Sequence, residues 1–224
     1  MQRLLYHPFF TGIVLLLLLG NVFVFPQGTQ QTSNTQTIPQ AFRSLVPQGF
    51  TLDSPQTHKT AGGGIAMGGV TFRASKKLDP SRLVNKITYD FELKIMEYPD
   101  FMIKMQAQAY RDQLEKDIQE RLKSWTSRHE ENEFSPVVTY DKPQLKRYSW
   151  GAAITQKATH KYMGEGKGPG DEIAYECSYL GVLIDNRSIK LFDFSASGVS
   201  SVEEANGWAD KASKKAAQTY AADL

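Results

Sequence analysis

The sequence predicts an α+β fold in which a curved antiparallel sheet, built as a meander of long strands, is packed by two amphipathic helices. Three patterns support this prediction. Apolar and polar residues alternate from Ile87 to Tyr98, strand-like segments follow one another late in the chain, and apolar residues recur at helical spacing after Pro99 and after Ser201. An apolar N-terminal transmembrane or signal segment precedes all of these elements.

The apolar N-terminal segment has the length and the flanking charges of a membrane anchor. No charged residue occurs between Arg3 and Arg43, and the stretch that begins at Leu4 is long enough to cross a hydrocarbon core of about 30 Å. The leading arginine favours an N-terminus inside the cell and a domain outside the cytoplasm. We expect residues 1–26 to contact the lipid bilayer through Phe9, Leu15, Leu16, Leu17, Leu18, Leu19 and Phe25.

A cleaved signal peptide is the alternative interpretation of the same segment. The apolar stretch is longer than the ~7–15 residues typical of signal peptides, and no small-x-small cleavage site follows it, so an uncleaved anchor is favoured. Residues 27–45 are rich in Gln, Thr and Ser, which predicts a flexible tether. Residues 46–224 have the length of a single globular domain. This domain would be periplasmic or extracellular, and secreted if the segment is cleaved.

Charge balance and cysteine count exclude some classes of function. The formal net charge is +2, from 26 basic and 24 acidic residues, without the clustered basic excess of nucleic-acid-binding proteins. Cys177 is the single cysteine, so a zinc site built from several thiolates is excluded. We therefore expect no nucleic acid, no metal and no other cofactor.

The first half of the domain is expected to hold two strands and a long helix. A loop at 58–64 precedes a strand that ends at Arg73, and the alternating segment that ends at Tyr98 forms the next strand. Asp100 is a plausible N-cap for a helix that ends near Ser127. A charged loop and a short strand ending at Tyr140 would follow. The apolar stripe of the helix contains Ile103, Ala107, Tyr110, Leu114, Ile118, Leu122 and Trp125.

Three strands are expected next, over 145–163, 173–184 and 188–197. A trial register places Tyr162 opposite Ile173 and Ile184 opposite Ile189. This register gathers one largely aromatic face, which consists of Trp150, Ile154, Tyr162, Ile173, Tyr175, Cys177, Tyr179, Leu183, Phe192 and Phe194.

Two overlapping capping-box patterns predict the start of the last helix. Ser200 and Ser201 are each followed three residues later by glutamate. Small apolar residues around Trp208 would let this helix lie close to the sheet. The order of elements is broadly like that of the PsbP-like α/β/α sandwiches, a likeness of topology that no residue motif accompanies and that assigns no family.

Several suggestive motifs have ordinary structural interpretations. The glycines at 62–69 match neither the dinucleotide nor the phosphate-loop pattern and predict a flexible loop. His129 begins a zincin-like pattern, but Glu133 stands where the second histidine is required. Asp90 and Glu92 lie on one face of a strand and are expected to be solvated. Cys177 faces the aromatic side in the trial register near His160, and a buried, unreactive thiol is favoured over a nucleophile.

The glycine-rich connection at 164–170 is expected to be a hairpin turn that uses glycine for positive φ. Its functional interpretation is a contact loop formed by Gly164, Glu165, Gly166, Lys167 and Gly168.

The favoured function is a membrane-tethered accessory or scaffold subunit that binds another protein and performs no chemistry. The alternative is a small-molecule binding domain that uses the aromatic sheet face. A hydrolase based on Cys177 or on the carboxylate pair is the third hypothesis.

Overall fold

The computed structural model describes residues 43–62, 64–132, 138–166, 168 and 170–219. The predicted membrane segment, Phe9 to Phe25 included, and almost all of the predicted tether lie outside this part of the chain. Among the helices that are described, none combines the length and the apolar character needed to cross a bilayer.

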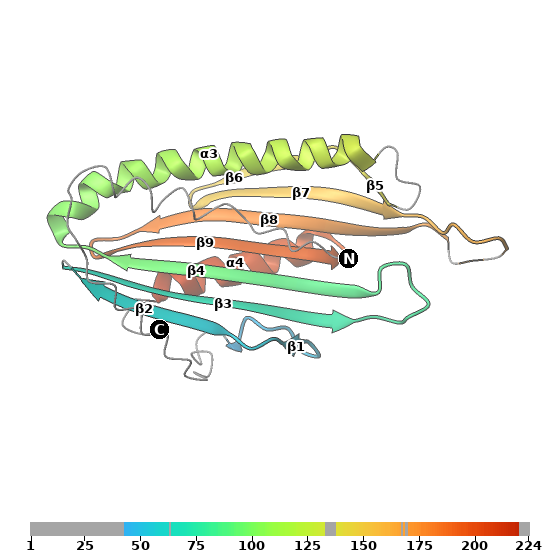
Figure 1. Ribbon diagram of the computed structural model, residues 1–224, viewed down its shortest axis with the longest axis horizontal. Coiled ribbons are helices and arrows are strands. Elements are labelled where there is room, and N and C mark those ends of the chain that lie inside the picture. Colours follow the sequence, from blue (N-terminus) through green and yellow to red (C-terminus); the bar gives the residue numbers. More distant parts are fainter. Residues whose placement is uncertain (1–42, 63, 133–137, 167, 169, 220–224) are drawn as a thin grey trace. The chain divides into compact units, whose positions relative to one another are not determined.

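Within the described residues, nine antiparallel strands form one sheet and two helices pack on it, which confirms the α+β class (Figure 1). The strand order is β1-β3-β4-β9-β8-β7-β5, with β2 paired to β3 and β6 paired to β7. The elements are β1 (Thr51–Leu52), β2 (Gln56–Gly62), β3 (Ile65–Lys77), β4 (Lys86–Glu97), α3 (Asp100–Asn132), β5 (Val138–Tyr140), β6 (Gln144–Tyr148), β7 (Gly151–His160), β8 (Glu172–Ile184), β9 (Ser188–Val199) and α4 (Val202–Gln218).

The two helices cover opposite faces of the sheet. Neighbouring residues of a strand point to opposite sides. On β8, Tyr179 belongs to the core under α4, whereas the adjacent Ser178 accepts a hydrogen bond from Arg121 of α3. Helix α4 is capped as predicted, because the Ser201 side chain accepts a hydrogen bond from the Glu204 amide.

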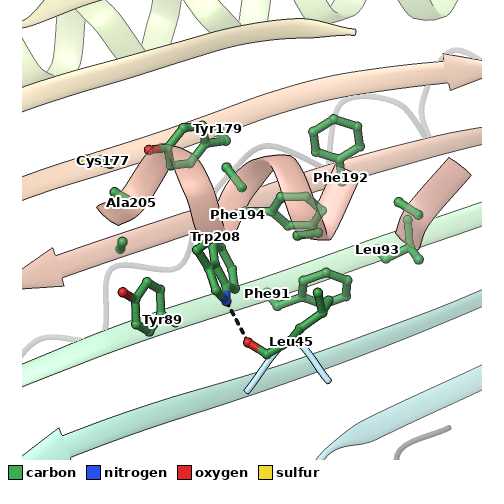
Figure 2. Packing of buried hydrophobic residues seen from close by; sticks show 14 of the residues in the cluster. Leu45, Tyr89, Phe91, Leu93, Cys177, Tyr179, Phe192, Phe194, Ala205 and Trp208 are labelled. Carbon is green, nitrogen blue, oxygen red and sulfur yellow. Dashed lines mark hydrogen bonds between the residues drawn. The ribbon is translucent and has the colours of Figure 1, made fainter. Parts of the chain in front are cut away.

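The core under α4 is a series of stacked aromatic rings (Figure 2). Phe91 lies against Phe194 at 4.6 Å, and Phe194 lies against Phe192 at 4.6 Å, each pair nearly parallel. Trp208 of α4 closes the cluster and donates its indole N–H to the carbonyl of Leu45 at 2.9 Å. Leu45, assigned to the end of the tether by sequence, is 4% exposed and belongs to this core.

The trial register is correct for one strand pair and wrong for the other. Ile184 pairs with Ile189, as predicted. Ile173 pairs with Thr159 and not with Tyr162, which is a shift of three residues along β7. An odd shift moves side chains to the other face. Ile154 therefore lies opposite Ser178 on the α3 side, fully buried, and does not belong to the aromatic face.

Four predicted segments have different bounds in the structure. The predicted strand 145–163 is two strands, β6 and β7, that pair with each other; Gly151 begins β7, where a Cβ would lie 2.0 Å from the Leu180 carbonyl oxygen. The predicted loop 58–64 is mostly strand β2. The glycine segment 62–69 was predicted to be a flexible loop, but its residues 65–69 belong to strand β3. Position 69 has room only for glycine, because a Cβ there would lie 2.2 Å from the His58 ring. Helix α3 continues beyond Ser127 to Asn132.

Candidate functional site

In the connection between β7 and β8, the described residues 161–166, 168, 170 and 171 extend past the ends of the neighbouring strands (Figure 1). We call this connection, together with Ile173, the β7–β8 arm. Its apolar side chains are exposed: Tyr162 is 41%, Met163 60% and Ile173 51% accessible. Large apolar side chains grouped on a projecting hairpin are candidates for an interaction surface.

The base of the arm is fastened to the connection between β3 and β4. The Glu172 carboxylate accepts a hydrogen bond from the Val84 amide at 2.8 Å and one from Arg82 Nε at 3.2 Å. These contacts lower the pKa of Glu172: the largest contribution is the backbone hydrogen bond, burial opposes it, and Arg82 adds to it. The ionised carboxylate therefore holds the arm in place at neutral pH.

The glycines of the tip make room for an aromatic ring. A Cβ at Gly168 would lie 2.0 Å from the Tyr162 ring, and one at Gly164 would lie 2.2 Å from its hydroxyl. Gly166 has a φ of +115°, which side chains rarely adopt. The predicted contact loop, including Glu165, thus forms the tip of the arm, while Lys167 lies outside the described residues.

A second candidate is a groove beside α3 that sequence reasoning did not identify. It has a volume of about 380 Å³ and lies between α3, the β6–β7 turn and the end of β8. We call it the α3 groove. Its apolar lining comes from Leu114, Ile118, Val182 and the stacked pair Tyr148 and Trp150; its charged lining comes from Arg111, Glu115 and Arg147.

The charges of the α3 groove are unevenly partnered. Arg147 binds Glu115 with both terminal nitrogens, at 2.5 and 2.6 Å, and Gln119 donates a third hydrogen bond to the same carboxylate. These hydrogen bonds, that of Arg147 foremost, lower the pKa of Glu115. Arg111 lies one helical turn before Glu115, yet it makes no hydrogen bond or ion pair with any described residue.

A cluster of largely buried polar side chains lies between α3 and the sheet, beside the apolar residues of the helix. Arg121 donates to Ser178 at 2.7 Å and to Asp193 at 2.9 Å. Asp117 is 6% exposed; one of its oxygens accepts from Gln113, and the other has no hydrogen-bond partner among the described residues. Burial raises the pKa of Asp117 to about 6. This cluster fixes how α3 lies on the sheet.

The structure separates Cys177 from His160. Cys177 pairs with Thr155, whereas His160 pairs with Glu172, five positions further along β7. At about 3.3 Å per residue, five positions correspond to roughly 16 Å. The proximity expected from the trial register is therefore wrong. Burial raises the pKa of the Cys177 thiol to about 12, so the thiol is not a nucleophile at neutral pH.

The carboxylates on β4 are solvated, as predicted. Asp90 binds Arg73 at 2.5 Å, Glu92 binds Lys94 at 3.3 Å, and all four side chains remain partly accessible. The backbone at His129 belongs to α3 and not to a loop, and its side chain lies outside the described residues. Among the residues that are described, no group of three or more His, Cys, Asp or Glu side chains could hold a metal ion.

The part of the predicted aromatic face that lies under α4 is filled by protein. Tyr89 lies 4.8 Å from Trp208, and Phe194 lies 5.7 Å from the same ring (Figure 2). These rings form the core under α4.

No family model and no curated protein matches the sequence. A solved structure, that of LpqN, which is involved in cell envelope biogenesis of Mycobacterium tuberculosis, is similar at 10% sequence identity over 80% of this chain and 92% of that chain, with a TM-score of 0.24. A likeness at this TM-score carries no argument about function.

Proposed function

We propose that this protein is a membrane-tethered, extracytoplasmic accessory subunit that binds another protein through the β7–β8 arm and performs no chemistry of its own. The observation that carries the proposal is the group of exposed apolar side chains, Tyr162, Met163 and Ile173, on a hairpin whose base is fastened by Glu172. A fastened arm loses less conformational entropy on binding than a free loop, which favours contact with a partner.

The apolar area on the arm is of useful size for a protein contact. Complete burial of a large apolar side chain contributes about 1.5–3 kcal/mol. The three arm side chains are about half exposed, so their burial in an apolar cleft of the partner would contribute a few kcal/mol. The partner is therefore expected to offer such a cleft to the tip of the arm.

The N-terminal segment supports the location in this proposal. Its uncharged, leucine-rich sequence has the composition of a membrane anchor, and the packed part of the domain begins by Leu45. Determining the N-terminal residue of the mature protein, with protease protection in intact cells, tests the anchor and its orientation. A mature chain that starts after residue 26, or a domain that is protected with the cytoplasm, would overturn this part.

The partner is tested by a paired substitution experiment on the full chain. The triple variant Tyr162→Ser, Met163→Ser and Ile173→Ser removes the apolar arm. The control is Phe101→Ser with Met105→Ser, which removes two side chains that are 72% and 65% exposed on α3. Both variants should fold, because neither changes a buried residue.

Purification from membranes in mild detergent should yield a stoichiometric partner with the wild type and with the α3 control, but not with the arm variant. A photo-crosslinker at position 163 should label the same partner, and one at position 105 should not. A wild-type protein that purifies alone, or a partner kept by the arm variant, contradicts the proposal.

A further inference from the structure

We infer that the α3 groove binds a small carboxylic acid with an apolar ring, which would be a ligand separate from the protein partner of the arm. The inference rests on the juxtaposition of a stacked aromatic wall, an apolar floor and the guanidinium of Arg111 at one groove. It is independent of the β7–β8 arm, so either proposal can fail alone.

The apolar part of the ligand is indicated by the lining of the groove. Ile118 is almost fully buried, and Val182 is 9% exposed, so the floor is held rigidly by the core. Tyr148 and Trp150 stack at 4.7 Å with nearly parallel planes, and both are only partly buried. Aromatic rings pair by offset stacking or edge-to-face contact, so this wall suits a flat apolar ring.

The carboxylate is indicated by the charges. Two arginines line the groove against one glutamate, and that glutamate is fully engaged by Arg147 and Gln119. Among the described residues Arg111 has no hydrogen-bond or ion-pair partner, so its five N–H donors face solvent or a ligand there. A planar guanidinium binds a carboxylate with two parallel hydrogen bonds, which an alcohol cannot reproduce.

The volume agrees with a ligand of this kind. Ligand pockets span about 300–1,000 Å³. A groove of about 380 Å³ therefore suits a compact molecule of one or two rings. Its aromatic wall adjoins the core under α4, because Trp150 lies 5.2 Å from Phe192.

Calorimetric titration of the purified full chain with three matched probes tests the inference. The probes are 2-naphthoate, 2-naphthylmethanol and 2-naphthylmethylamine, which share the ring and differ in charge. We expect 2-naphthoate to bind at least about fivefold more tightly than the alcohol, which corresponds to about 1 kcal/mol, and the amine to bind most weakly. Raising the salt concentration should reduce the difference, since Arg111 is exposed.

Two variants locate the site and one serves as the control. Arg111→Gln should abolish the preference for 2-naphthoate over the alcohol, and Leu114→Trp should fill the groove and weaken all three probes. Lys123→Gln removes an exposed cation of the same helix outside the groove and should change nothing. Absence of 2-naphthoate binding, equal binding of acid and alcohol, or an unchanged preference in Arg111→Gln would overturn the inference.

Discussion

Gly181→Ala tests whether the aromatic core under α4 is as rigid as its geometry indicates. A Cβ at position 181 would lie 2.0 Å from Cζ of Phe192, and 2.4 and 2.6 Å from its Cε atoms. The ring cannot move aside easily, because Phe192 is fully buried between Phe194 at 4.6 Å and Trp150 at 5.2 Å. Position 181 faces Phe192 directly in the β8–β9 ladder.

The magnitude follows from two opposing effects. Overpacking a well-packed core costs about 1–3 kcal/mol, through side-chain angles forced away from their minima and small backbone shifts. Replacing glycine in a strand returns about 0.5–1 kcal/mol of backbone entropy. We therefore expect Gly181→Ala to lower the free energy of unfolding by about 1–2 kcal/mol.

Chemical denaturation followed by circular dichroism measures this change. The matched control is Gly207→Ala, since a Cβ at this exposed position of α4 meets nothing within 4 Å. The control should be stabilised by up to about 1 kcal/mol. Phe192→Leu should cost less in the Gly181→Ala background than in the wild type, because the smaller side chain relieves the contact. A Gly181→Ala protein as stable as the wild type, or additive costs in the double variant, would refute a rigid core.

Three further predictions concern buried groups. Burial raises the folded-state pKa of Asp117 from 3.8 to about 6, so the contribution of this carboxyl to stability is greatest below pH 4 and falls as the pH rises towards 6. Denaturant titrations should show that the wild type, relative to Asp117→Asn, loses up to about 3 kcal/mol of unfolding free energy between pH 4 and pH 7. Parallel pH profiles of the two proteins would contradict this. Cys177 should react with a thiol reagent at pH 8 only as fast as the domain unfolds, and rapid labelling of the native protein would count against its burial. Trp208→Phe removes the pyrrole half of the indole together with its N–H, so the Leu45 carbonyl loses its donor and the core loses some packing; melting experiments should show a loss of at least about 1–3 kcal/mol, and an unchanged stability would contradict this role of Trp208.

The length of each connection explains which registers could be predicted. The turn at 185–187 is short and leaves few possible pairings of β8 with β9, and Ile184 opposite Ile189 is correct. The connection at 161–171 leaves the register of β7 and β8 free. No geometric constraint therefore supported the pairing of Tyr162 with Ile173. This wrong pairing placed Ile154 on the wrong face of the sheet.

Glycine was the signal that could have corrected the strand boundaries. Residues 145–163 were predicted as one strand, although Gly151 follows directly on the turn between β6 and β7. At the tip of the arm, Gly164 and Gly168 were identified, but their reason, the adjacent Tyr162 ring, depends on three-dimensional packing.

The α3 groove could not be predicted from the sequence. Its residues come from 111–118, 147–151 and 182–184, three segments that no local pattern connects. Each segment has a sufficient local explanation, since Arg111 and Glu115 resemble an exposed helix surface and Trp150 resembles core. Only the passage of α3 beside the β6–β7 turn brings them together.

The contact between Leu45 and Trp208 determines how the domain would respond to mechanical tension. A pull applied through the preceding chain enters the fold at Leu45, whose carbonyl is held by one hydrogen bond. The next element, β1, pairs with β3 only at Thr51 and Leu52. Few backbone hydrogen bonds therefore hold this part of the chain, whereas the ladders that join β3, β4, β9 and β8 are long. Under load, the chain up to about Leu52 would lengthen first, and the rest of the sheet would stay intact.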